Sequence, residues 1–243
     1  MDLTDTGFLP ATKSTKDRLI ISIDGLEKQG KTHWGLTSPG PLGILNMDIG
    51  HEGVVDKFLK NQNIFISNIK IPSAIEGNTD QITRSAIEIW EQFKKDYYWG
   101  LENLKSLVVD TATEAWELLR LAYFGKLTQI KSHHYTAANA QFRKLIRDAY
   151  ESDCNLILIH KRKKQYIEGF EGKANWNGEY ERSGFSEIGF LVQVDITAYR
   201  DKEGEFHIRV NDCRQNAMLK GEDLTGPINT FNCLQKMIAV SYD

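Results

Sequence analysis

The chain alternates short, continuous apolar runs with longer polar or amphipathic stretches. The apolar runs fall at residues 18–24, 41–48, 63–71, 106–110, 155–160, 190–199 and 205–211. Because these runs are apolar at successive rather than alternate positions, they are typical of strands that are buried on both faces, as in parallel sheets. The pattern therefore predicts a largely parallel sheet.

Helical patterns fill several of the intervals between these runs. The clearest helical stretches are about 81–99, 112–127 and 136–152. In the third stretch, apolar residues recur at helical spacing and form one stripe that is expected to face the core. The stripe consists of Phe142, Leu145, Ile146 and Ala149. Since strands and helices alternate as far as residue 160, the sequence predicts a sheet built from βαβ units with helical cover.

The pattern changes near residue 185, beyond which strands follow one another directly. The sequence AYRDKEGEFHIRV predicts an antiparallel hairpin with Glu203 and Gly204 near its turn. The segment 161–184 has no regular periodicity and is expected to be a loop, either functional or disordered. The predicted fold class is therefore α/β, with a mostly parallel central sheet flanked by helices and a late antiparallel hairpin.

Composition places the chain among ordinary globular proteins. Its 243 residues are 41% hydrophobic and 26% charged, so a core can form without disulfides or metals. The three cysteines lack Cys-x-x-Cys spacing, which argues against a disulfide framework or a zinc site. Residues 1–17 are predicted to be a polar leader and 18–243 a single domain. With no apolar run of membrane-spanning length and no secretory signal, we expect a soluble protein of the cytoplasm, the host cytoplasm if the source is a virus.

The octapeptide GLEKQGKT follows directly after the first apolar run. Glycines at its first and sixth positions let the backbone curl so that successive N–H groups point at phosphate oxygens. Lys31 supplies a positive charge to the β- and γ-phosphates, and the Thr32 hydroxyl can bind Mg²⁺. The predicted nucleotide-binding residues are Gly25, Leu26, Glu27, Lys28, Gln29, Gly30, Lys31, Thr32 and His33.

A carboxylate partner for this loop is found in the run SLVVD, which ends at Asp110. An aspartate at the carboxyl end of a strand can bind the same Mg²⁺ as Thr32. Asp110 or Thr111 could also cap the helix that follows, and the two roles are compatible. The pair of motifs predicts Mg²⁺ and ATP as ligands; GTP is less favoured because the sequence contains no Asn-Lys-x-Asp motif for reading guanine.

In this region the chain resembles the RecA-like P-loop ATPase core, and most closely the compact phage single-strand annealing ATPases used in recombination. The resemblance rests on Gly-Lys-Thr-His at 30–33, a proline-containing turn and the acidic corner NMDIGHEG, and it extends over about 18–215. It implies that a carboxylate in the corner activates the attacking water. Asp48 is the favoured general base and Glu52 the alternative.

The same resemblance implies two further catalytic roles. His160 ends the strand after that of Asp110, at the position from which a polar residue senses the γ-phosphate in RecA-like cores. A catalytic cation often comes from a neighbouring subunit in this fold. Arg200, Arg209 and Arg214 lie on or after the late strands, and Arg214 is the candidate that we retain.

The segment after His160 combines basic and aromatic residues. A net charge of -3 gives no global reason to expect affinity for nucleic acid or for a membrane, so an anionic partner would need such a local patch. Cations that follow a phosphate backbone, with aromatic rings on which bases stack, are typical of single-strand binding. Glutamates reduce the segment's net charge to about +2 by count, so a solvated surface is the alternative. The predicted DNA-binding residues are Lys161, Arg162, Lys163, Lys164 and Tyr166, with the aromatic residues Phe170, Trp176 and Tyr180 nearby.

These features together predict an ATP hydrolase that depends on DNA, binds single strands and promotes annealing in homologous recombination. Its expected partners are single-stranded DNA, further copies of the chain in a ring or filament and, as a candidate, a single-strand-binding protein. Two alternatives stay open. One is a P-loop kinase of a nucleotide or small metabolite, with 161–184 as its lid, and the other is a non-hydrolysing ATP switch in replication.

Overall fold

The computed structural model of the protein describes residues 17–48, 51–60, 63–71, 79–125, 132–168 and 174–240. Except for Asp17, the predicted leader lies outside these residues, as does Phe170 of the predicted DNA-binding segment. Within the described ranges, no helix combines the length and the apolar character that a membrane crossing requires.

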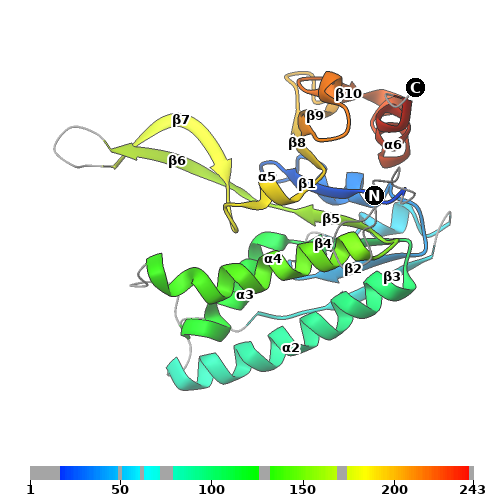
Figure 1. The fold of residues 1–243 in the computed structure, drawn as a ribbon. Helices are drawn as coiled ribbons and strands as arrows, with labels where there is room; N and C mark the ends of the chain where they lie inside the picture. The colour runs from blue at the N-terminus through cyan, green and yellow to red at the C-terminus, as the bar shows by residue number, and fades with distance from the viewer. Residues whose placement is uncertain are drawn as a thin grey trace, which may run out of the picture.

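An eight-stranded sheet forms the centre of the molecule (Figure 1). Its strands lie in the order β10-β9-β8-β1-β5-β4-β2-β3. The six neighbouring strands from β8 through β1, β5, β4 and β2 to β3 pair in parallel, whereas β9 pairs antiparallel with both β8 and β10. The strands are β1 (Ile20–Asp24), β2 (Leu42–Asn46), β3 (Ile64–Asn68), β4 (Ser106–Asp110), β5 (Asn155–Ile159), β8 (Val194–Arg200), β9 (Phe206–Cys213) and β10 (Asp223–Thr225). All seven predicted strands are present, and β8 and β9 form the predicted hairpin.

Helices cover both faces of the sheet. One face packs against α2 (Thr79–Asn103), α3 (Ala112–Phe124) and α4 (Thr136–Glu151), which correspond to the three predicted helices (Figure 1). The other face packs against the short helix α1 (Lys31–Gly35), the 3-10 turn η1 (Val55–Lys57) and α6 (Phe231–Ala239). A four-residue helix, α5 (Ile188–Leu191), precedes β8. The predicted α/β fold class is confirmed.

The alternation of side chains along each strand divides the core into two clusters. In β4, Leu107 and Val109 pack under the long helices, whereas Val108 packs on the side of α1. The central strands are completely buried, which explains why their sequences are apolar at successive positions. The predicted stripe on α4, from Phe142 to Ala149, lies in the core as expected.

The prediction of a loop at 161–184 was wrong for most of this segment. Residues Arg162–Glu168 (β6) and Ala174–Arg182 (β7) pair antiparallel as a separate two-stranded ribbon, which extends away from the central sheet in Figure 1. The described side chains near its far end are exposed on both faces of the ribbon, so burial imposes no apolar periodicity on its sequence. The short elements α5, α6 and β10 were likewise not predicted, whereas α1 is the short helix expected after the phosphate loop.

Candidate nucleotide-binding site

The phosphate loop connects the end of β1 to the start of α1. A Cβ atom at Gly25 would lie 2.4 Å from the carbonyl oxygen of Ala198, so only glycine allows this approach of the loop to β8. Gly30 has a φ of +86°, which is costly for residues with a side chain. The Lys31 ammonium donates hydrogen bonds to the carbonyl groups of Gly25 (2.8 Å) and Leu26 (2.6 Å). The positive charge of Lys31 therefore lies over the loop that the sequence predicts to bind phosphate.

The two sequence motifs meet at a hydrogen bond between Thr32 and Asp110. The Thr32 hydroxyl donates to Oδ2 of Asp110 at 2.7 Å. Asp110 is only 3% exposed, and burial raises the pKa of its carboxyl group; the bond from Thr32 opposes that shift. A hydroxyl and a carboxylate at this distance form a donor set suited to Mg²⁺. Thr111, the residue after Asp110, is the predicted N-cap of α3. Its hydroxyl accepts a hydrogen bond from the Glu114 N–H.

Lys161 lies beside these groups and bridges two acidic side chains. Its ammonium is 3.1 Å from Oδ2 of Asp48 and also contacts Glu114. Burial alone would lower the pKa of Lys161, but the hydrogen bonds to Glu114 and Asp48 outweigh it and raise the pKa. Asp48 also acts electrostatically on Asp110. The structure thus places Asp48 in the site, whereas Glu52 is exposed.

A second group of charges surrounds Asp24, the residue immediately before the phosphate loop. Asp24 is 4% exposed and accepts a hydrogen bond from the Thr197 hydroxyl at 2.7 Å. Arg182, at the end of β7, lies 3.3 Å from one carboxylate oxygen of Asp24 and also contacts Asp195. Arg162, at the start of β6, lies 3.8 Å from the other oxygen. Both strands of the ribbon are therefore attached to the base of the phosphate loop.

His160 directly follows β5, and its backbone N–H donates a hydrogen bond to the carbonyl group of Ile23 in β1. Its ring is completely buried. Burial lowers the pKa of His160 from the usual 6.5 to about 3, and the positive charge of Arg182 adds to this effect. The imidazole is therefore neutral at neutral pH, and its role as a γ-phosphate sensor stays a prediction.

The buried His160 should make the stability of the protein depend on pH. Its pKa is lower in the folded than in the unfolded chain, so stabilisation that is present above pH 6.5 is lost as the pH falls toward 3. From pH 7 to pH 5 we expect His160 to lower the free energy of unfolding by about 2 kcal/mol. Urea unfolding of the wild type and of His160→Gln at both pH values measures this difference. Equal pH dependence in the two proteins would show that His160 does not contribute it.

The predicted DNA-binding residues separate into two groups. Lys161 and Arg162 point into the nucleotide site, as described above, and are half-buried. Lys163, Lys164 and Tyr166 are exposed on the ribbon.

Arg214 lies at the opposite edge of the sheet. Its backbone N–H donates to Gln193, which precedes β8, whereas the phosphate loop lies at the carboxyl ends of β1 and β8. Its guanidinium donates to the carbonyl group of Phe190 at 2.9 Å. Arg214 therefore cannot contact the phosphate loop of its own chain, and the predicted role requires a neighbouring subunit.

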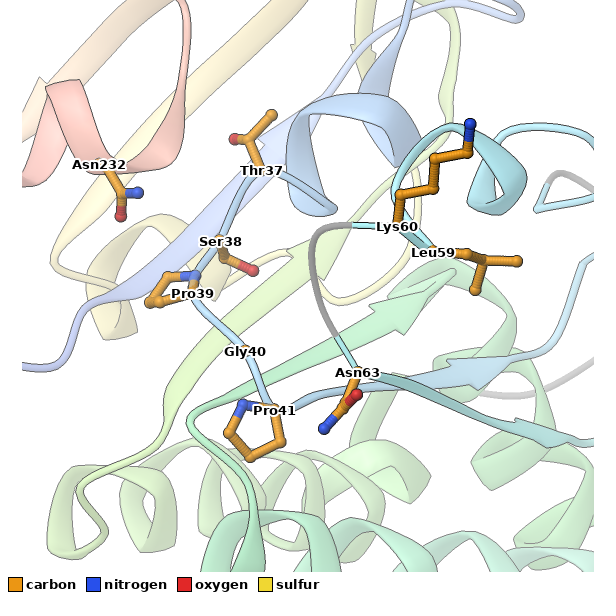
Figure 2. Close-up of a pocket in the computed structure, with 9 residues that line it drawn as sticks. All are labelled: Thr37, Ser38, Pro39, Gly40, Pro41, Leu59, Lys60, Asn63 and Asn232. Atoms are coloured by element: carbon orange, nitrogen blue, oxygen red, sulfur yellow. The ribbon is translucent and has the colours of Figure 1, made fainter.

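A cavity of about 600 Å³ also lies away from the phosphate loop (Figure 2). It opens where β2 and β3 begin, at the edge of the sheet opposite Asp110. The Pro39-Gly40-Pro41 turn forms one wall, and Lys60 and Asn232 lie around it (Figure 2). This cavity is therefore separate from the nucleotide site.

Several residues of the site were not predicted from the sequence. Asp24 could have been noted, since it ends an apolar run immediately before Gly25. Glu114 follows Asp110 by one helical turn, which is a similar local signal. Arg182, Asp195 and Phe206 carry no local signal, because they reach the site from chain segments far away in sequence: Arg182 contacts Asp24, Asp195 contacts Arg182, and the Phe206 ring lies against Gly30.

Comparison with known proteins identifies the family. The sequence model of a family described as "AAA domain" matches residues 18–188. Among solved structures, the crystal structure of the RadB recombinase superposes with a TM-score of 0.49 at 12% identity, over 84% of each chain. A search of curated proteins finds no match. Because the family match spans most of the chain and includes both nucleotide-binding motifs, the protein belongs to the AAA domain family, with an α/β P-loop NTPase fold.

Proposed function

We propose that the protein hydrolyses ATP and that its ribbon binds single-stranded DNA, so that nucleotide controls a DNA-annealing activity in recombination. The observation that carries this proposal is the attachment of the ribbon to the site. Lys161 contacts Asp48, and Arg162 and Arg182 lie against Asp24. Because the same cations neutralise the site and begin or end the ribbon, a change of charge at the loop can affect both.

The residues of the site fit Mg²⁺-ATP. The loop backbone approaches its neighbours so closely that Gly25 and Gly30 admit no side chain, and Lys31 provides the cation for the phosphates. Thr32 and Asp110 would hold Mg²⁺, which would neutralise phosphate charge when bound. Asp48 is the proposed general base, because its carboxylate lies beside this donor set and Lys161 keeps it oriented. Hydrolysis then requires only that these groups position the water and the phosphates.

The ribbon separates its side chains into two different faces. On one face Tyr166 pairs with Trp176 across the strands, Trp176 contacts Tyr180, and the Lys164 ammonium lies 4.8 Å above the Trp176 ring. Tyr166 and Trp176 are 58% and 46% exposed, which leaves ring surface free for stacking. On the other face Lys163 forms an ion pair with Glu181 at 3.2 Å. The aromatic face is therefore the proposed DNA-binding surface.

The two adjacent lysines provide a matched test of this assignment. Lys164→Ala removes the cation of the aromatic face and should weaken binding of an oligothymidylate, reducing its salt slope by about 0.7. Trp176→Ala removes a stacking surface and should weaken binding about tenfold. Lys163→Ala, on the opposite face and already paired with Glu181, serves as the control. Fluorescence anisotropy across a salt series measures all four proteins. Equal effects of the two lysine variants would contradict the assignment to one face.

The overall function is tested by measuring phosphate release with and without single-stranded DNA. We expect DNA to stimulate phosphate release by the wild type but not by Trp176→Ala. Transfer of phosphate to an added nucleotide or metabolite would instead identify a kinase. Slow hydrolysis at a rate that DNA does not change would identify an ATP switch. Assembly of copies, with Arg214 acting on the neighbouring site, would make the rate per subunit rise with protein concentration.

A further inference from the structure

The hydrogen bond between Thr32 and Asp110 marks the end of the site at which the proposed function places the γ-phosphate. Asp110 ends β4, and the neighbouring groups Asp48 and Lys161 lie on the same side of the loop. In the proposed function the γ-phosphate reacts beside these residues. Relative to β1, this end lies on the side of β5 and β4, so the nucleoside must extend toward the other neighbour of β1, which is β8.

The hairpin of β8 and β9 places an aromatic ring on that side of the loop. Phe206 begins β9, and a Cβ atom on Gly30 would lie 2.7 Å from its ring. Arg200 pairs with Phe206 across the hairpin, and its guanidinium carbon lies 5.8 Å from the centre of the ring. The ring is half-buried and Arg200 is exposed. A flat apolar surface with a planar cation above it thus borders the phosphate loop.

His33 completes this group of planar side chains from the side of α1. Its imidazole is 6.4 Å from the Phe206 ring and 4.9 Å from the Phe58 ring, both edge-on. Burial lowers the pKa of His33, and the positive charges of Lys57 and Arg200 lower it further, so the ring is neutral at neutral pH. A neutral imidazole adds planar surface without repelling the guanidinium.

We propose that Phe206, Arg200 and His33 form the subsite for the nucleobase of the bound triphosphate. The inference rests on the proposed nucleotide binding and specifies what recognises the base. The three groups offer stacking faces and a planar cation, so the subsite selects by the size of the ring system. Purine triphosphates therefore bind more tightly than pyrimidine triphosphates. The phosphate loop contributes equally to both classes, since it contacts only the phosphates.

Inorganic tripolyphosphate separates the subsite from the phosphate loop, because it carries the phosphates without a base. Binding of Mg²⁺-ATP, Mg²⁺-CTP and Mg²⁺-tripolyphosphate is measured by calorimetry for the wild type, Phe206→Leu and Arg200→Ala. Leucine keeps most of the apolar volume that supports Gly30 and loses the flat ring, while Arg200 is exposed, so both variants should fold. Phe190→Ala removes a ring that is 84% exposed, in α5 far from the loop, and serves as the control.

We expect Phe206→Leu to lower the affinity for ATP about tenfold, and Arg200→Ala several-fold, with tripolyphosphate binding unchanged. The preference for ATP over CTP should shrink in both variants and persist in Phe190→Ala. Unchanged ATP binding, or equal losses for ATP and tripolyphosphate, would overturn the subsite while leaving the phosphate loop intact. If the wild type binds neither ATP nor tripolyphosphate, the proposed function fails together with the subsite.

Discussion

Replacement of Lys31 by alanine is expected to lower the rate of ATP hydrolysis by at least about a hundredfold. The ammonium of Lys31 is the cation held over the phosphate loop, where it bonds to the carbonyl groups of Gly25 and Leu26. Charge that develops on the transferred phosphoryl group would lose its fixed partner in the variant. Because the loss concerns the transition state, saturating ATP should not restore the rate.

The measurement is phosphate release at saturating Mg²⁺-ATP, with single-stranded DNA present and absent. Lys60→Ala is the control, since it removes the same charge from an exposed position beside the cavity at the opposite edge of the sheet. Thermal unfolding of both variants establishes that the fold is kept. A Lys31→Ala protein that hydrolyses ATP at the wild-type rate would show that the reaction takes place elsewhere or that another protein catalyses it.

The phosphate loop and Asp110 could be predicted because their signals are local. The spacing of Gly25, Gly30 and Lys31 is defined within one octapeptide, and Asp110 ends a continuous apolar run. Parallel strands place their carboxyl ends at one edge of the sheet, so a hydroxyl and a carboxylate at two such ends meet. The Thr32–Asp110 hydrogen bond follows from these rules.

The partners of the basic cluster could not be predicted in the same way. From the sequence, residues 161–164 are four consecutive cations, and counting charges treats them alike. In the structure Lys161 pairs with Asp48 and Arg162 lies near Asp24, so half of the cluster belongs to the nucleotide site. These pairings join residues more than a hundred positions apart. They depend on how β6 leaves the sheet, which local patterns do not encode.

The ribbon itself was missed for a related physical reason. Strand prediction depends on burial, which imposes an apolar period, whereas the described part of the ribbon is largely solvated. Its pairing is held by contacts across the strands, such as that of Tyr166 with Trp176. The mixed basic and aromatic composition led to the prediction of DNA binding, which stays a prediction, and it did not indicate the geometry of the segment.

Asp48→Asn is expected to lower the maximal rate of hydrolysis by about 10² to 10⁴, whereas Glu52→Gln should leave it close to that of the wild type. The sequence left both carboxylates open as general base. Asp48 lies 3.1 Å from Lys161 and acts electrostatically on Asp110, while the Glu52 side chain is exposed. Asparagine keeps the shape of the side chain and its capacity to accept a hydrogen bond from Lys161. It cannot take a proton from water.

The two carboxylates are compared in single-turnover hydrolysis together with direct measurement of ATP binding. A loss of rate in Asp48→Asn with ATP affinity retained would place the defect in the chemical step. Lys161→Met tests whether Lys161 only positions the base: it removes the ion pair with Asp48 and should reduce the rate less than Asp48→Asn does, since the carboxylate that accepts the proton is still present. If Glu52→Gln alone removes hydrolysis, the general base is Glu52, and its exposed side chain must move toward the phosphates before the reaction.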